Sequence, residues 1–259
     1  MTFRIGITES DKSPSATVFD LPGCGAEASD RSSLDQLVPV CISEYLSWLR
    51  SHGETTHDES TIQFEVVEEI DPTSIKAADG EFCFADDRGQ ATPEDIETAV
   101  RYMGHAREDL LDTISGLNDV VLDWRPPKSA MARINPWKPV VLTIREIVQD
   151  IAGAEGYYRT GLQDGESTSE AGDERPNLES QRARTLERLH TLSDAELSQV
   201  FRPRRSWQEG SEIWTVRKVL RRVIDHERFH TAEIQQRLTW LLLGVPDFTN
   251  SGTRRQADL

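Results

Sequence analysis

Two histidines, His226 and His230, stand four residues apart within the longest helical pattern of the chain. Apolar residues from Val216 to Leu241 recur there at the period of an α-helix, and both histidines occupy positions in that apolar stripe. Side chains four residues apart lie on one face of a helix, so both imidazoles can reach a single metal ion. Because a buried imidazole needs a polar partner, the pair predicts either a shared metal ion or a metal-free hydrogen-bonded network at the core face of this helix.

Helical spacing begins at Thr92 and continues over most of the remaining chain. We predict helices from the Thr92 cap to about residue 117, from the Thr143 capping box to about Tyr158, over Leu178–His190, and from Thr215 to Leu243. Residues 119–142 contain four prolines, so they form a long connection rather than a continuous helix. These elements predict a four-helix bundle over residues 92–246 and a flexible tail over residues 247–259.

A carboxylate on the second predicted helix can complete a metal site. Asp150 lies three residues after Ile147 and borders the apolar face, where an unpaired carboxylate would be costly. An ion shared by Asp150, His226 and His230 would satisfy all three groups and leave coordination positions open for water or substrate. Glu227 is turned about 100° from His226, so we expect it at the rim, paired with an arginine or lysine, with a catalytic acid or base role left open.

The first third of the chain alternates apolar and polar residues, which is typical of strands. The alternation predicts a hairpin of Phe3–Ile7 and Ala16–Asp20, a third strand over Ala26–Ser29 and a fourth over Thr61–Val67. Between the last two, a helix is expected to begin at Val38 or Pro39, because proline lacks a backbone donor. We therefore predict an α+β chain, with a small β-β-β-α-β domain over residues 1–70 and a linker over residues 71–91 before the all-α bundle.

Two short stretches characterise the N-terminal unit. Leu21-Pro22-Gly23-Cys24 ends the predicted hairpin, and Tyr45-Leu46-Ser47-Trp48-Leu49 lies late in the helix. With the order of elements, these stretches make residues 1–70 resemble the HicB family of small antitoxin-like domains. The resemblance implies either packing and homodimerisation or a protein partner such as a small basic RNase toxin. HicB proteins usually carry a DNA-binding module as well, and nothing resembling a helix-turn-helix follows in this sequence.

Two stretches of the predicted bundle carry a second resemblance. Thr143-Ile144-Arg145-Glu146-Ile147 leads to Ala154-Glu155, and Trp214-Thr215-Val216-Arg217-Lys218-Val219-Leu220 leads to His226-Glu227-Arg228-Phe229-His230. Residues 92–245 are thereby similar to the DinB family of four-helix bundles. This resemblance implies a divalent metal, such as zinc, nickel or iron, bound by one histidine of the second helix and an H-x-x-x-H pair of the fourth. The pair maps onto His226 and His230, whereas Asp150 occupies the second-helix position, a departure that affects metal preference.

Three functions are consistent with these patterns. Some DinB-like proteins join a low-molecular-weight thiol, such as mycothiol or bacillithiol, to an electrophile, so the resemblance implies a metal-dependent S-transferase or hydrolase acting on a small-molecule electrophile. The alternative is a non-enzymatic interaction or regulatory protein with a degenerate metal site. HExxH is also a zinc-peptidase pattern, but its extended form needs glycine and histidine where this chain has Glu233 and Gln236.

Composition argues against some partners. The formal net charge of −16 is unfavourable for binding nucleic acid through its phosphates. No apolar run approaches the roughly 20 residues that cross a membrane, so we expect a cytoplasmic protein. Cys24, Cys41 and Cys83 lack CxxC spacing, which predicts reduced thiols.

The remaining polar and aromatic residues have simpler expectations. Surface positions are expected for His52, His57, His105 and His190, and Glu155 is expected to face solvent or an arginine. Trp207 and Trp214 are expected to pack near the start of the fourth helix. A basic cluster either receives an acidic cofactor or balances the acidic N-terminal domain, and it comprises Arg202, Arg204, Arg205, Arg217, Lys218, Arg221 and Arg222.

Overall fold

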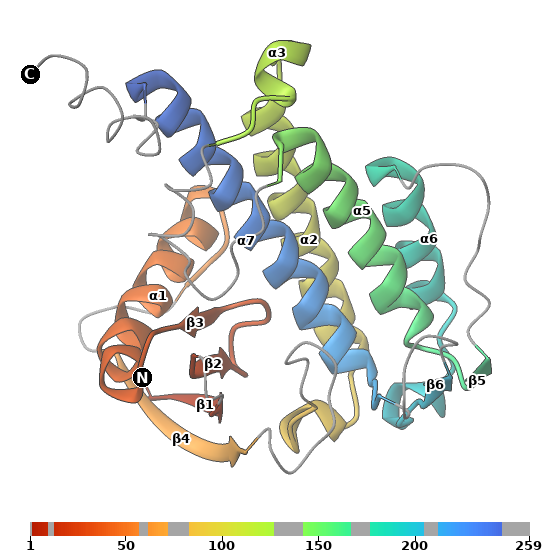
Figure 1. The fold of residues 1–259 in the computed structure, drawn as a ribbon. Coiled ribbons are helices and arrows are strands. Elements are labelled where there is room, and N and C mark those ends of the chain that lie inside the picture. The colour runs from red at the N-terminus through yellow and green to blue at the C-terminus, as the bar shows by residue number, and fades with distance from the viewer. Residues whose placement is uncertain are drawn as a thin grey trace, which may run out of the picture.

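A small sheet with one helix precedes a group of long helices in the computed structural model of this chain (Figure 1). The structure describes residues 2–9, 13–56, 62–71, 83–126, 142–166, 177–204 and 212–244. Residues 72–82 of the predicted linker and the whole predicted tail fall outside these residues, as do His57, Arg205 and Trp207. Among the described helices, none has the length and apolar character needed to span a membrane.

The N-terminal unit has the predicted β-β-β-α-β order. Its elements are β1 (Thr2–Thr8), β2 (Ser15–Val18), β3 (Gly25–Glu27), α1 (Arg31–Ser51) and β4 (Gln63–Ile70). The strand order in the sheet is β3-β2-β1-β4, with β1 antiparallel to β2 and parallel to β4. The parallel pair requires a crossover, which α1 supplies. The antiparallel pairing of β1 and β2 confirms the predicted hairpin. Alternate residues of β1, namely Phe3, Ile5 and Ile7, pack against the buried face of α1.

The expected start of α1 was wrong. The helix begins at Arg31 because Asp30 caps it, accepting a hydrogen bond of 2.8 Å from the Ser33 backbone N–H. Pro39 lies inside the helix and removes one donor to the carbonyl of Asp35. Asp35 is exposed, so water can satisfy that carbonyl, while the buried stripe through Leu34 and Val38 keeps the first turns on the sheet.

Four long helices follow, with boundaries close to those predicted from their caps. They are α2 (Pro93–Ile114), α5 (Ile144–Thr160), α6 (Leu178–His190) and α7 (Val216–Leu243). Shorter elements are η3 (Asp86–Arg88), α3 (Asp119–Leu122), β5 (Gly165–Glu166), η4 (Glu196–Ser198) and β6 (Pro203–Arg204). Thr92 and Thr143 form capping boxes at α2 and α5, and Gly244 ends α7 in the left-handed conformation at φ 62°.

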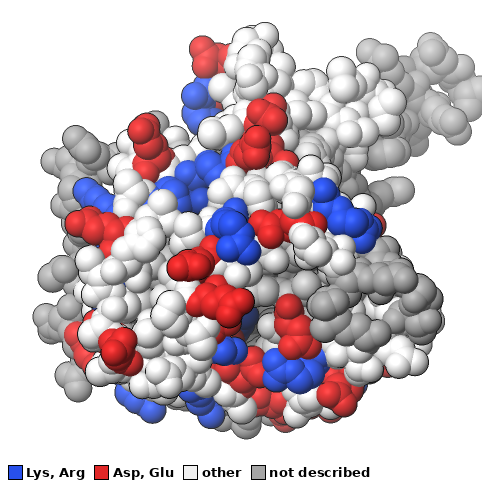
Figure 2. Space-filling model, turned by 180° about the vertical axis from the view of Figure 1, so that it is seen from behind, with Lys and Arg blue, Asp and Glu red and all other residues white. Residues whose placement is uncertain are grey.

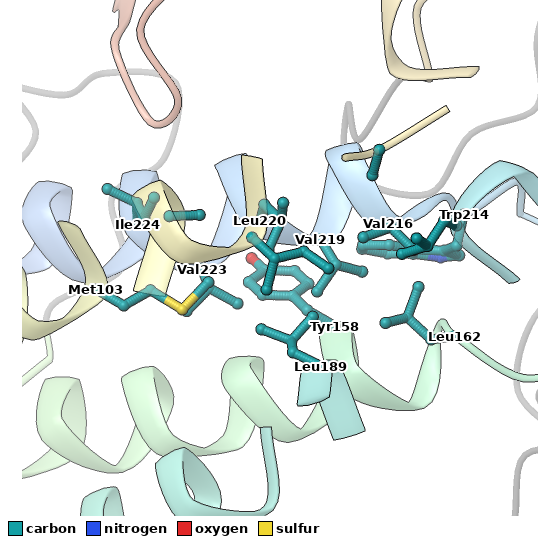
Figure 3. Close-up of a cluster of buried hydrophobic side chains, with 14 of the residues drawn as sticks. Met103, Tyr158, Leu162, Leu189, Trp214, Val216, Val219, Leu220, Val223 and Ile224 are labelled. Atoms are coloured by element: carbon teal, nitrogen blue, oxygen red, sulfur yellow. The ribbon is translucent and has the colours of Figure 1, made fainter. Parts of the chain in front are cut away.

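Helix α7 is the central element of the molecule. It packs against α2 and α5, and α6 packs against α5 (Figure 1). The main apolar core lies at these contacts and includes Met103, Tyr158, Trp214 and Val219 (Figure 3). Trp214 is fully buried and packs there as expected, and Tyr102 contacts both this core and the core of the N-terminal unit.

The N-terminal unit is docked directly on α7. Gly23 has a φ of +84°, and a Cβ atom on it would lie 2.4 Å from Cγ2 of Ile224, so only glycine suits this turn against the helix. Arg228 of α7 extends its guanidinium over the rings of Tyr45 and Trp48, at 4.3 and 4.2 Å from their centroids. This cation–π arrangement links the bundle to α1.

Basic residues of α7 also bind the segment that follows the sheet. Asp87 is buried and accepts hydrogen bonds of 2.7 and 2.8 Å from Arg221, while Arg217 pairs with Asp95 at 3.0 Å. The fully buried ammonium of Lys218 pairs with Glu212 at 3.0 Å. The cluster was expected to balance the acidic N-terminal domain or to receive an acidic cofactor. Of the carboxylates named here, only Asp87 precedes the bundle, whereas Asp95 and Glu212 belong to the bundle itself. On the face seen in Figure 2, basic and acidic side chains are likewise interspersed.

The three cysteines are free thiols, as predicted. Cys24 and Cys83 are buried and Cys41 is half-buried. Burial is the main reason that the pKa of each thiol is raised, which keeps it protonated and unreactive near neutral pH.

We expect Arg228→Ala to lower the free energy of unfolding by about 2 kcal/mol, because it removes both the cation–π contacts and the packing of the arginine stem. Urea denaturation followed by circular dichroism would measure the change. Arg50→Ala, which removes an exposed arginine of α1, is the matched control and should cost less than about 0.5 kcal/mol. Equal stability of the two variants would contradict the role assigned to Arg228.

Candidate metal centre

The packing of α5 against α7 brings Asp150, His226 and His230 together. Oδ2 of Asp150 lies 3.2 Å from Nε2 of His230 and 3.7 Å from Nε2 of His226. One ligand atom from each residue lies within 4.8 Å of the other two. In a tetrahedral site with metal–ligand bonds of roughly 2.0–2.1 Å, neighbouring ligand atoms are about 3.3 Å apart. The separation between Asp150 and His230 is therefore already that of two ligands of one ion, while His226 would have to move closer by a few tenths of an ångström or more.

His230 is held in place by a chain of polar contacts on α7. Its Nδ1 lies 2.7 Å from Oε2 of Glu233, and the other carboxylate oxygen of Glu233 lies 2.9 Å from the buried guanidinium of Arg237. Arg237 is anchored in turn by a 3.0 Å hydrogen bond from Nε to the carbonyl of Leu142. A carboxylate on one ring nitrogen leaves the other aimed at a metal, as is usual for histidine ligands.

The same contacts shift the pKa values of His230 and Glu233. Burial alone would lower the pKa of His230, but the hydrogen bonds to Asp150 and Glu233 outweigh it and the pKa is raised. Burial would raise the pKa of Glu233, but its bond to His230 and the charge of Arg237 outweigh that effect and the pKa is lowered. Asp150 and Glu233 thus form an electronegative surrounding for the imidazole of His230, which favours a cation at this position.

The centre faces the surface on the side of Asp150. The Asp150 side chain is 51% exposed, against 17% for His226 and 11% for His230. On the inner side, the ring of Tyr158 lies edge-on to His226 with centroids 5.7 Å apart. The space beside it, between Ile151, Val223 and Tyr158, is too small to admit a water molecule. A metal or small ligand would therefore enter along the Asp150 face.

Glu227 does not lie at the rim, contrary to expectation. It is 1% exposed, and Glu155, which was expected to face solvent or an arginine, is 3% exposed. Each carboxylate is paired with both Arg107 and Arg182, and Arg182 donates to Glu155 at 2.7 Å. Both oxygens of Glu227 are engaged by guanidinium groups. For Glu227 the predicted pairing with arginine was therefore right and the predicted rim position was wrong, whereas Glu155 contacts arginines, one of its two expected surroundings.

These four side chains form a buried network that spans the bundle. Arg107 comes from α2, Glu155 from α5, Arg182 from α6 and Glu227 from α7. Arg107 also donates to the carbonyl of Leu178 at 2.8 Å and Arg182 to that of Met103 at 2.7 Å. Burial lowers the pKa of Arg182, but the charges of Glu155 and Glu227 more than compensate, so it is raised and the guanidinium stays charged.

Two of the remaining histidines also differ from expectation. His52 and His105 were expected at the surface, but their side chains are 12% and 20% exposed and lie against each other at the junction of α1 and α2. His190 is exposed as predicted. Glu233 was missed as a partner of the metal centre. Its position three residues after His230 on the same helix is the signal that could have identified it.

One protein-family model matches a segment of the chain. The model of the DinB superfamily matches residues 106–234, a segment that contains Asp150, His226 and His230. The match begins within α2, so the N-terminal sheet lies outside it. No curated protein and no solved structure matches the chain. Proteins of the DinB superfamily often bind a divalent metal, and the candidate centre lies within the matched segment.

We expect Glu227→Gln to lower the free energy of unfolding by about 3–5 kcal/mol, because it leaves two buried guanidinium groups without a full countercharge. Glu187→Gln, which changes an exposed glutamate of α6, should leave stability within about 0.5 kcal/mol of the unmodified protein. Urea denaturation of both variants would measure the difference. A Glu227→Gln protein as stable as its control would refute the structural importance of the network.

Proposed function

We propose that Asp150, His226 and His230 bind a divalent metal ion, and that the protein is a metal-dependent transferase of low-molecular-weight thiols or a hydrolase. The observation that carries the proposal is the convergence of three donor atoms on one point, with a carboxylate already orienting His230. Two imidazoles and one carboxylate suit zinc, nickel or iron and leave coordination positions for a ligand. Such an ion would lower the pKa of a thiol or a water molecule and so create a nucleophile near neutral pH.

The residues of this chain would have distinct tasks in that reaction. His226 and His230 fix the position of the ion on α7, and Glu233 keeps His230 in the orientation required for binding. Asp150 contributes a negative charge on the open side of the centre, where the small-molecule electrophile would approach. In the transfer, the thiol sulfur forms a bond to the electrophile, the leaving group departs with its electron pair, and the thiol proton passes to water.

The peptidase alternative is weakened by the position of Glu227. A peptidase of the HExxH type needs this glutamate free to activate water beside the metal. Here both of its carboxylate oxygens accept hydrogen bonds from Arg107 and Arg182 in the buried network. A base that is fully engaged and enclosed in this way is a poor candidate for catalysis.

A second candidate function is non-enzymatic interaction or regulation. It is consistent with the small hollow beside His226, which has no room for a water-sized sphere and so offers no substrate pocket on that side of the histidine. The order of elements in the N-terminal unit supports a HicB-like module that mediates homodimerisation or binds a protein partner. In this case the metal would serve stability rather than catalysis. Removal of the metal would then destabilise the bundle, and neither the metal-loaded nor the metal-free protein would catalyse a thiol-dependent reaction.

We expect His226→Ala, His230→Ala and Asp150→Ala each to remove one equivalent of tightly bound zinc, because three ligands cannot be reduced to two without a large loss of affinity. Isothermal titration of the untagged, metal-stripped protein with zinc would measure the loss. His190→Ala is the matched control, since it removes an exposed histidine of α6 and should keep the full stoichiometry.

The same variants distinguish the two candidate functions. The metal-loaded protein should consume a bacillithiol- or mycothiol-type thiol in the presence of a chloroalkyl electrophile, and His226→Ala should lower that rate by at least 100-fold. An unaltered metal content in His226→Ala would exclude the proposed centre. A centre that binds metal but supports no thiol reaction would favour the interaction protein.

Glu233→Gln should weaken zinc binding by about 10–100-fold while retaining the fold, because it removes the carboxylate that orients His230. Gln236→Ala, at an exposed position on the same helix, should leave the dissociation constant unchanged. Zinc titration of both variants, with circular dichroism as a check on folding, measures the effect. Identical affinities would mean that Glu233 has no part in positioning the ligand.

A further inference from the structure

A second group of potential metal ligands lies where the end of α1 meets the middle of α2. His52 follows the last turn of α1, while His105 and Glu108 stand three residues apart on one face of α2. One nitrogen of each ring and one carboxylate oxygen of Glu108 lie within 4.8 Å of one another. The two imidazoles are mostly buried, and Glu108 is exposed, so the cluster opens to solvent along the carboxylate.

Each imidazole is held in place by a contact between one of its ring nitrogens and a neighbouring oxygen atom. Nδ1 of His52 lies 3.0 Å from the carbonyl oxygen of Trp48, and Nε2 of His105 lies 3.0 Å from Oε1 of Glu54. The rings lie close together, with centroids 4.6 Å apart and planes inclined by 33°. The contacts at Nδ1 of His52 and Nε2 of His105 favour the tautomers that leave Nε2 of His52 and Nδ1 of His105 as metal-binding nitrogens. Asp109 lies beside Nε2 of His52, so on metal binding its carboxylate would yield that nitrogen to the ion or bind the ion as well.

The charges around the pair favour a cation. Oδ1 of Asp109 lies 3.2 Å from Nε2 of His52, and its Oδ2 accepts a 2.6 Å hydrogen bond from Trp48 Nε1. Glu54, Glu108 and Asp109 thus place three carboxylates next to two imidazoles, and Arg101 lies 3.2 Å from Glu54. In a metal-free cluster Asp109 pairs with His52, Glu54 pairs with His105, and water solvates the exposed Glu108. A metal ion would instead bring Glu108 and the two imidazoles to one centre.

We propose that His52, His105 and Glu108 bind a second divalent transition metal ion, with zinc as the representative ion. Two imidazoles select a metal of this class over magnesium or calcium, which prefer oxygen ligands. The site joins α1 of the N-terminal unit to α2 of the bundle, so the ion stabilises the docking of the two parts. His52 and His105 both lie outside the segment that matches the DinB superfamily, and the site does not depend on the proposed function at Asp150.

The test uses the full, untagged chain with His226→Ala and His230→Ala, which removes the first centre. Metal-stripped protein is titrated with zinc, and we expect one equivalent to bind and to raise the Tm. Adding Glu108→Gln to this background should weaken zinc binding at least 10-fold. Its side chain is exposed, so the substitution should not disturb folding. Glu97→Gln, at another exposed position of α2, is the matched control and should change neither the affinity nor the Tm.

His52→Gln provides an independent variant, because glutamine keeps a polar group at the end of α1 while removing the ligand nitrogen. In the same background it should also weaken zinc binding at least 10-fold. Zinc binding that is absent from the background, or that is insensitive to both Glu108→Gln and His52→Gln, would overturn the second site. If the first centre does not bind zinc, the result is different. In that case Glu108→Gln or His52→Gln, made in the otherwise unmodified protein, would reduce zinc binding, whereas His226→Ala would leave it unchanged.

Discussion

The buried network of Arg107, Glu155, Arg182 and Glu227 is the interaction on which the bundle depends. Each of the four long helices contributes one charged side chain, and each guanidinium contacts both carboxylates. Such groups are costly to bury unless the pairing geometry is good, so few alternative helix rotations are compatible with it. Glu227 directly follows His226, and the network therefore also sets the rotation that directs the histidines of α7 towards α5.

Three consecutive residues of α7 serve three different parts of the molecule. His226 belongs to the candidate metal centre, Glu227 to the buried network, and Arg228 to the contact with Tyr45 and Trp48 of α1. Successive side chains on a helix are separated by about 100°, so a single helix can address all three surroundings. A change that rotates α7 is therefore expected to affect metal binding, bundle stability and N-terminal docking together.

The capping residues predicted the ends of most helices, because a helix cap and the backbone groups that it bonds to lie within a few residues of each other in the sequence. Thr92, Thr143 and Gly244 mark helix ends through hydrogen bonds or backbone conformations that involve only near neighbours. Pro39 misled the prediction, since the capping bond from Asp30 and the buried stripe of α1 outweigh the one donor that proline removes. The loss of a single hydrogen bond at a solvated position is a small energetic effect beside the burial of a helix face.

The order of the main elements, the ends of α2, α5, α6 and α7, and the common helix face of His226 and His230 follow from periodicity and local capping, so they could be predicted from the sequence. The burial of particular charged residues could not, since the partners of Glu227 stand 45 and 120 residues away in the chain. The tertiary structure decided their burial, and it also decided that His52 and His105 share one junction rather than two separate surfaces. Burial of a charge depends on a countercharge from another helix, and helical periodicity carries no information about which distant residue supplies it.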